Sequence, residues 1–213
     1  MSTRKDSFSS SDDNDWQRDD SDNTSSMQKP FQNNPSKSIL ILGETGGGKS
    51  TFINTITNYF KEGDLENLKV AIPTVYLKAT EGYAHTENNT HNNAMSQTND
   101  CTTYSFDVEG KTYNFIDTPG LNDTRDSQQD DKNMQKILDL AQTTADLAGV
   151  LLIVNGTQTR LTPALENVMI TLRGNLPDRI MANTIVVLSK CNKSSTAFQR
   201  STLTRVVPNI QKQ

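Results

Sequence analysis

A glycine-rich stretch from Gly43 to Thr51 carries the residues of this sequence best suited to chemistry. Four residues separate Gly43 from Gly48-Lys49-Ser50, which is the spacing of loops that bind nucleotide phosphates. Consecutive glycines let the backbone curl until successive N–H groups face one point. We therefore expect a polyphosphate to bind here, largely through the main chain of Gly43, Glu44, Thr45, Gly46, Gly47, Gly48 and Thr51.

Two side chains of this stretch supply a charge and a metal ligand. The Lys49 ammonium would neutralise the β- and γ-phosphates, and the Ser50 hydroxyl would coordinate Mg²⁺. Glu44 and Thr45 would contribute mainly backbone, whereas Thr51 would lie nearer the α-phosphate. We therefore predict a magnesium-dependent triphosphate site in which Lys49 is the principal catalytic charge.

A strand and a helix would hold this phosphate loop in place. Ile39 to Leu42 is an apolar run, which predicts a strand over about residues 38–42. Apolar residues then recur at helix-face spacing and predict a helix over about residues 49–60. The order of strand, loop and helix aims the positive end of the helix at the bound phosphates.

A second candidate motif, Asp117-Thr118-Pro119-Gly120, follows a predicted antiparallel hairpin. Residues 102–108 alternate in polarity, Glu109-Gly110-Lys111 makes a turn, and residues 112–116 form the returning strand. In a phosphate-loop fold this strand ends at the edge that faces the phosphates, so Asp117 would hold Mg²⁺ through water or from behind its direct ligands. The Gly120 N–H could bond the γ-phosphate and sense its loss.

The rest of the chain alternates helices and strands. A helix is predicted over residues 128–145, a buried strand over 149–154, a helix from Thr162-Pro163 to about Gly174, and a strand over 184–188. This order predicts an α/β fold of the P-loop NTPase type, a doubly wound sheet that is mostly parallel with one antiparallel hairpin strand. Its ligand should lie at the carboxyl ends of the strands.

Three segments fall outside this pattern. Residues 1–37 are rich in Ser, Asp and Asn, and we expect a disordered polar tail there. Residues 61–95 would be an insertion before the first switch, in which Val70 to Leu77 has β-type composition but Pro73 allows only an edge strand or a bulge. Residues 193–213 are polar apart from Val206-Val207, which suggests a divergent or truncated C-terminal tail.

Composition excludes several classes of protein. No apolar run reaches the length of a membrane span, so we expect no integral membrane segment. The net charge of −4 argues against nucleic acid as the main partner. Only two cysteines occur, which together with the phosphate loop favours a reducing, cytoplasmic setting. His85 and His91 lie in a polar stretch without metal-ligand spacing.

The two motifs together resemble the translation-factor class of GTPases, and within it the septin and AIG1-type (immunity-associated) GTPases. Residues 43–54 are similar to the first motif of these families, and residues 116–124 to their second switch. Residues 96–101, Ser-Gln-Thr-Asn-Asp-Cys, resemble the AIG1 pattern Ser-x-Thr-x-x-Cys ahead of the hairpin. The resemblance covers about residues 38–192 and implies a protein that binds GTP or GDP with Mg²⁺.

The resemblance also implies a first-switch threonine. Thr98 occupies that position, where its hydroxyl and carbonyl would close on Mg²⁺ and the γ-phosphate and make it a second catalytic residue. Thr102 and Thr103 lie close in sequence and are alternatives for this role.

Recognition of the base departs from the family pattern. The class has Asn/Thr-Lys-x-Asp after the fifth core strand, whereas this chain has Ser189-Lys190-Cys191-Asn192. The Lys190 stem can still cover the base, but Asn192 can accept one hydrogen bond from guanine and not two. A second register, Asn192-Lys193-Ser194-Ser195, restores Asn-Lys but lacks the acid. Guanine preference is thus implied by the family and not by these residues.

Hydrolysis would proceed by attack of water on the γ-phosphate. Leu121 follows Gly120 and cannot orient water, so we expect slow turnover unless a partner or a second subunit supplies the missing group, and Arg125 is a weak candidate to act in trans. Two alternatives remain: an ATPase or other purine triphosphatase built on the same loop, and a nucleotide-binding scaffold without turnover. The latter could assemble as a homo- or hetero-oligomer through its nucleotide face.

Overall fold

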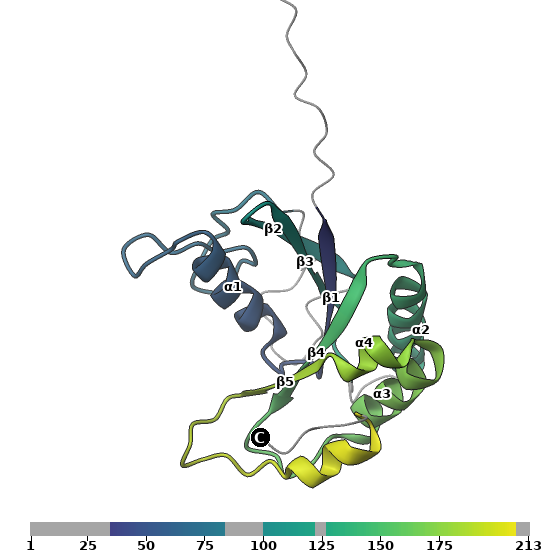
Figure 1. The fold of residues 1–213 in the computed structure, drawn as a ribbon. Helices are drawn as coiled ribbons and strands as arrows, with labels where there is room; N and C mark the ends of the chain where they lie inside the picture. Colours follow the sequence, from purple (N-terminus) through teal and green to yellow (C-terminus); the bar gives the residue numbers. More distant parts are fainter. Residues whose placement is uncertain (1–34, 84–99, 122–126, 208–213) are drawn as a thin grey trace, which may run out of the picture. The chain divides into compact units, whose positions relative to one another are not determined.

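A five-stranded sheet with the order β2-β3-β1-β4-β5 forms the centre of the structure (Figure 1). The computed structural model describes residues 35–83, 100–121 and 127–207. Among the described strands only β2 is antiparallel to its neighbour, which confirms the predicted sheet. The strands are β1 (Ser36–Gly43), β2 (Thr102–Val108), β3 (Lys111–Asp117), β4 (Leu147–Asn155) and β5 (Thr184–Ser189).

Helices connect these strands in the predicted order. The predicted helix at 49–60 is α1 (Lys49–Phe60), and the one expected over 128–145 is α2 (Ser127–Thr143). In α3 (Pro163–Asn175) the side chain of Thr162 accepts a hydrogen bond from Leu165 N, so the predicted N-cap is confirmed. Two short elements were not predicted, because neither is long enough to show a helical period: α4 (Asp178–Ala182) and the 3₁₀ helix η1 (Arg200–Arg205).

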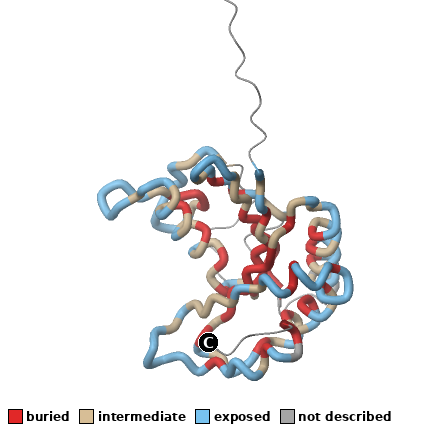
Figure 2. Tube along the Cα trace, viewed as in Figure 1, coloured by how far each residue is buried: buried red, intermediate tan, exposed pale blue. Residues whose placement is uncertain are grey.

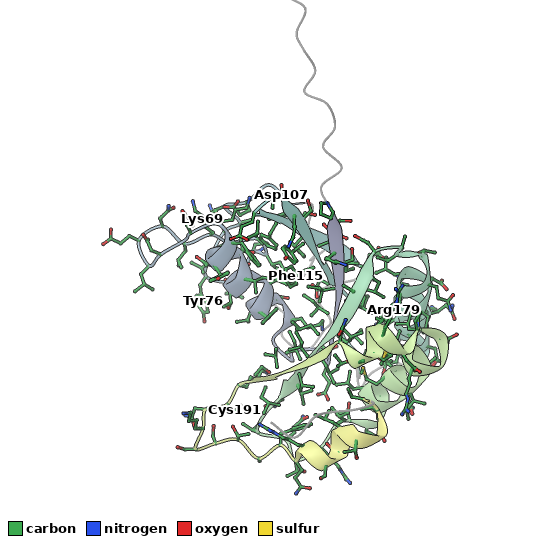
Figure 3. The ribbon with its side chains drawn as sticks, in the orientation of Figure 1. Lys69, Tyr76, Asp107, Phe115, Arg179 and Cys191 are labelled. Atoms are coloured by element: carbon green, nitrogen blue, oxygen red, sulfur yellow. The ribbon has the colours of Figure 1, made fainter. Side chains whose placement is uncertain are left out.

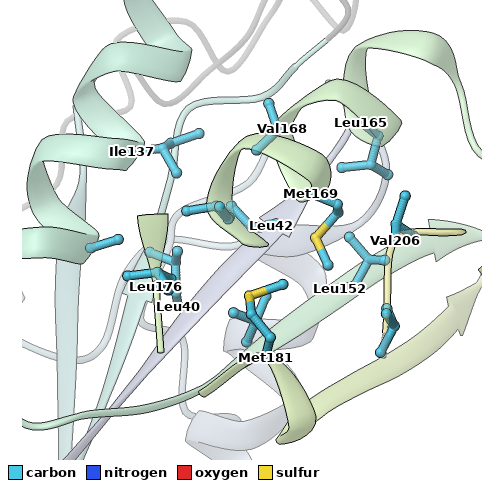
Figure 4. Close-up of a cluster of buried hydrophobic side chains, with 14 of the residues drawn as sticks. Leu40, Leu42, Ile137, Leu152, Leu165, Val168, Met169, Leu176, Met181 and Val206 are labelled. Carbon is cyan, nitrogen blue, oxygen red and sulfur yellow. The ribbon is translucent and has the colours of Figure 1, made fainter. Parts of the chain in front are cut away.

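Strand β1 is buried from both faces of the sheet, as its apolar run requires (Figure 2). Leu40 and Leu42 pack against α2 and α3, in the cluster of buried side chains drawn in Figure 4. Ile41 points to the other face and packs with Ile53 of α1. Helices therefore cover both faces, and the sheet is doubly wound.

The segment after α1 corrects one expectation. Residues 70–77, for which the sequence allowed an edge strand or a bulge, contain no strand. Instead Asn54 of α1 accepts hydrogen bonds from the N–H groups of Ala71 and Ile72 at 2.9 and 2.8 Å, and Asn58 accepts one from Lys69 N at 2.9 Å. Side-chain amides thus satisfy the backbone that strand pairing would otherwise satisfy, so Val70, Ala71 and Ile72 are buried without joining the sheet.

The described residues beyond β5 also join the core. Phe198, Leu203, Val206 and Val207 are buried and pack in the same cluster as α2 and α3. The segment expected to be a tail from 193 therefore contributes to the folded unit at least as far as residue 207. Of the other segments, the structure describes residues 35–37 of the polar tail and 61–83 of the insertion. No helix within the described ranges is long and apolar enough to cross a bilayer.

Candidate nucleotide-binding site

The glycine-rich loop connects β1 to α1 at the carboxyl end of the sheet. Gly46 and Gly48 have φ angles of 68° and 103°, which side-chain-bearing residues rarely adopt. Gly47 N donates to Glu44 O at 2.9 Å and closes a turn. A Cβ on Gly47 would lie 2.9 Å from Glu44 O, so the loop is too tightly curled for a larger residue. The glycines are therefore required by the conformation that brings amides together.

Lys49 begins α1 and is buried, with 7% of its surface exposed. Its ammonium donates to Gly43 O at 3.2 Å and to Glu44 O at 3.3 Å, so the charge lies over the loop. In the described structure no side chain caps the N-terminus of α1, and its first turn carries no acidic residue. An anion bound in the loop would meet the positive ends of the helix and of the Lys49 side chain.

The chain after β3 runs alongside this loop. Thr45 N donates to Leu121 O at 2.9 Å, and Leu121 N donates to Gly43 O at 3.3 Å. These bonds make a parallel bridge between Glu44 and Leu121 that continues the pairing of β1 with β3. The second motif is consequently held against the phosphate loop by the backbone, as its position in sequence predicted.

Buried side chains fix the second motif from the other side. Asp117, at the end of β3, is 1% exposed, and the hydroxyl of Thr118 donates to Ile41 O at 2.7 Å. Asn133 of α2 is also buried and its amide donates to Gly120 O at 3.2 Å. Sequence reasoning missed Thr118 and Asn133. A signal for Asn133 was present, because this polar residue lies one turn before Ile137 on the apolar face of its helix.

The first-switch region reaches the site at Cys101. In the hairpin register Thr102 lies opposite Asp117, so the start of β2 adjoins the candidate metal site. Burial and, to a smaller extent, the nearby Asp117 carboxylate raise the pKa of the Cys101 thiol to about 11, so the thiol is protonated at neutral pH. Thr98, the proposed first-switch threonine, lies outside the described residues, as do Arg125, His85 and His91.

The third motif also comes to the phosphate loop. The hydroxyl of Ser189, the last residue of β5, donates to Gly47 O at 2.6 Å. Lys190 follows with a φ angle of 56° and an exposed side chain. The sequence pattern assigned no separate role to Ser189. Its hydroxyl is the group that joins the base-recognition segment to the loop.

Asn192 is exposed and its side-chain oxygen is engaged inside its own loop. This oxygen accepts hydrogen bonds from Ser194 N at 2.9 Å and Ser195 N at 3.0 Å. The second register, residues 192–195, is therefore the turn that Asn192 caps. The structure brings Asn192 near the loop through β5 but uses its oxygen for local structure.

Two buried oxygen atoms next to the loop help to decide whether its residues fit a nucleotide. Glu44 Oε1 and Thr45 Oγ1 have no hydrogen-bond partner within the described ranges. Buried polar atoms nearly always have a hydrogen-bond partner, so two that have none indicate that a bound ligand supplies it. Together with the loop amides, the Lys49 ammonium, the Ser50 hydroxyl and the Asp117 carboxylate, the Thr45 hydroxyl fits a phosphate chain with a hard, oxygen-seeking cation, whereas the Glu44 carboxylate oxygen can only accept and needs a donor or a cation.

A family model and several solved structures show which proteins this chain is similar to. The family model described as AIG1 family matches residues 37–202. Solved structures of Toc33 from Arabidopsis thaliana are similar in fold: a dimerization-deficient mutant has a TM-score of 0.44 and 17% identity over 74% of this chain and 54% of that chain. The complex of Toc33 with GDP and Mg²⁺ has a TM-score of 0.44 and 20% identity over 72% of this chain and 50% of that chain.

The complex of Toc33 with Mg²⁺ and GMPPNP gives a TM-score of 0.43 and 21% identity, with the same coverage of 72% and 50%. This chain thus spans about half the length of the Toc33 chains. A comparison with curated proteins finds no match. The family model covers most of the sequence and runs from the second residue of β1 past the end of β5, and the chain belongs to the AIG1 family.

Proposed function

We propose that this chain binds guanine nucleotide with Mg²⁺ and hydrolyses GTP slowly, acting as a switch or an assembly module. One observation carries the proposal: the phosphate loop, the Asp117–Gly120 motif and the Ser189–Asn192 motif meet at one edge of the sheet through the hydrogen bonds described above. Membership of the AIG1 family and the Toc33 complexes with GDP and GMPPNP are consistent with a guanine nucleotide as the ligand.

Each group would have a separate task at the phosphates. The amides of residues 43–51 would hold the β-phosphate, and Lys49 would neutralise charge on the β- and γ-phosphates. Ser50, Thr98 and Asp117 would hold Mg²⁺, which when bound neutralises further charge on the phosphate oxygens. Gly120 N would contact the γ-phosphate, and Asn133 would hold the peptide of Gly120 in the orientation that allows this.

Slow hydrolysis follows from the position of Leu121. Its side chain is 1% exposed and packs in the core against α2 and α3, so it cannot orient an attacking water. A partner or a second copy would have to supply that group across the nucleotide face. The same observation favours the second candidate function, a nucleotide-binding scaffold with little turnover.

Cys101 and Cys191 are free thiols, which fits the cytoplasmic location that we propose.

The base-binding part of the proposal uses Lys190 and Asn192. Lys190 is exposed next to the loop, and its aliphatic stem would cover one face of the base. Asn192 would accept a hydrogen bond from guanine after its oxygen leaves the turn at Ser194 and Ser195. This rearrangement would lower base affinity, and competition by ATP and XTP measures how much preference for guanine remains.

Calorimetry with Mg²⁺ tests the proposal directly. We expect the wild-type chain to bind GTP and the Lys49→Ala variant to bind it about 100-fold more weakly, because a charge-assisted contact is worth about 1.5–3 kcal/mol and each 1.4 kcal/mol is tenfold. Lys61→Ala, an exposed lysine just beyond the end of the same helix, is the control and should bind normally. The proposal fails if folded wild-type protein takes up no purine triphosphate. Single-turnover phosphate release then separates a slow GTPase from the scaffold.

A further inference from the structure

The hydroxyl of Thr45 lies at the contact between the phosphate loop and the second motif. Thr45 is the second residue of the turn that Gly47 N closes on Glu44 O, and its own N–H donates to Leu121 O. If the loop binds phosphate through its backbone N–H groups alone, the side chain of Thr45 has no role in binding. Yet Thr45 Oγ1 is shielded from solvent and has no hydrogen-bond partner in the part of the chain that the structure describes.

Gly120 is packed directly over this hydroxyl. A Cβ on Gly120 would lie 2.4 Å from Thr45 Oγ1 and 2.8 Å from Thr45 Cα. Any side chain at position 120 would therefore displace either the hydroxyl or the loop. Only a residue without a side chain can therefore approach the Thr45 hydroxyl as closely as Gly120 does.

The neighbouring side chains leave a γ-phosphate in need of a further donor. Leu121, the next residue of the second motif, is turned into the core and offers no polar atom. The Lys49 ammonium donates to the carbonyls of Gly43 and Glu44. A threonine hydroxyl both donates and accepts, so one placed between the loop and Gly120 can bond a phosphate oxygen there.

We propose that the Thr45 hydroxyl is a γ-phosphate ligand that Gly120 covers in the absence of triphosphate. This inference rests on the proposed function and deepens it. When GTP binds, the hydroxyl donates to a γ-phosphate oxygen and Gly120 shifts off the hydroxyl so that its own N–H also contacts the γ-phosphate, and the two bonds couple the state of the nucleotide to the second motif. A diphosphate lacks that oxygen and leaves Gly120 over the hydroxyl. Thr45 therefore discriminates triphosphate from diphosphate.

The test compares GMPPNP and GDP binding to Thr45→Val, which removes the hydroxyl and keeps the volume, and to Thr45→Ser, which keeps the hydroxyl. With Mg²⁺ present we expect Thr45→Val to bind GMPPNP about tenfold more weakly and GDP within about twofold of wild type, because one hydrogen bond to a charged group is lost. Thr45→Ser should bind both as wild type does. Thr55→Val on the exposed face of α1 is the matched control.

Two outcomes overturn the proposal: GMPPNP affinity of Thr45→Val within twofold of wild type, or an equal loss for GMPPNP and GDP. If Thr45→Val does not fold, as judged by its thermal unfolding, Thr45→Ala replaces it with the same expected results. The failure of the proposed function is distinguishable, because in that case the wild-type chain itself binds neither nucleotide.

Discussion

The phosphate end and the base end of the candidate site are built differently. At the phosphate end, contacts are made by backbone groups and by glycines without room for a Cβ, and the flanking side chains Asp117, Thr118 and Asn133 are buried. At the base end, Lys190 and Asn192 are exposed, and the oxygen of Asn192 is bonded within its own turn. Only the hydroxyl of Ser189 links the second region to the first in the hydrogen bonds described above.

This difference separates what the fold requires from what specificity requires. A phosphate loop closes only if its backbone angles and close approaches are met, so changes there disturb the strand, the helix and the second motif together. An exposed loop that reads a base through side chains can change without disturbing the core. Accordingly, this sequence matches the family pattern closely at Gly43–Thr51 and departs from it at Ser189–Asn192.

Among the substitutions that remove no charge, we expect Gly120→Ala to weaken nucleotide binding at the phosphate end the most. The added Cβ would lie 2.8 Å from Thr45 Cα and 3.0 Å from Thr45 N, which are backbone atoms that cannot rotate away. We expect affinity for GTP to fall by about 5- to 150-fold, since such overpacking typically costs about 1–3 kcal/mol. Calorimetry measures this loss. Gly174→Ala is the control, because a Cβ there meets no atom within 4 Å, and wild-type affinity in Gly120→Ala would contradict the packing argument.

Ser189→Ala tests whether the hydrogen bond between the base end and the phosphate loop contributes to nucleotide affinity. The variant loses the bond from its hydroxyl to Gly47 O, which is 2.6 Å long. A neutral hydrogen bond contributes about 0.5–1.5 kcal/mol, so we expect affinities for GTP and GDP to fall together by about three- to tenfold. Thr184→Val removes a hydroxyl at the far end of the same strand, bonded to Met181 O, and should leave both affinities unchanged. A loss confined to GTP would show that Ser189 acts on the γ-phosphate and not on the loop.

The same contrast explains how far the sequence predicted this molecule. Strands and helices with a clear period, such as β2 and α1, were located to the residue, and the glycine spacing placed the loop at their junction. The mostly parallel, doubly wound sheet followed from the alternation of helices and strands, since parallel strands need crossover helices. The predictions for Thr98 and Arg125 lie outside the described residues and stay predictions.

What the sequence did not reveal depends on contacts between distant residues. The bond from Ser189 to Gly47 joins residues 142 positions apart, and that from Thr118 to Ile41 joins residues 77 apart. The side chain of Asn54 accepts the hydrogen bonds that a neighbouring strand would otherwise accept, and the spacing of apolar residues in the sequence does not indicate such bonds. Phe198 and Leu203 look isolated in a polar segment, but both are buried in the cluster that contains residues of α2, α3 and β4.

Asn192→Asp measures how much the base end contributes in its present form. A carboxylate can still accept from Ser194 N and Ser195 N, so the turn should be kept. We expect GTP affinity to change by less than about threefold, because the second acceptor gained for guanine is offset by the stronger hydrogen bonds to Ser194 N and Ser195 N that a carboxylate must give up when it leaves the turn. Competition of labelled GTP by GTP, XTP and ATP gives the three affinities. A gain of tenfold or more for guanine alone would show that the turn does not compete with the base for residue 192.

The smallest effect on nucleotide binding is expected at the amino end of the strands, where Asp146 accepts hydrogen bonds from the hydroxyls of Ser36 and Ser38. The bond from Ser36, helped by that from Ser38, holds the pKa of the Asp146 carboxyl below its ordinary value, although burial acts in the opposite direction. A carboxyl whose pKa is lower in the folded chain stabilises the fold above the pKa of the unfolded chain, near 4, and loses this contribution as the pH falls through the folded value.

Asp146→Asn should therefore lower the melting temperature at pH 7, and the difference from wild type should shrink as the pH falls below about 4. Its affinity for GTP at pH 7 should equal that of wild type, because no bond described here joins Asp146 to the carboxyl end of the sheet. Thermal unfolding between pH 3 and 7, followed by calorimetry at pH 7, measures both quantities. A melting difference that stays constant or grows toward low pH would show that packing, and not the charge on Asp146, stabilises this end of the strands.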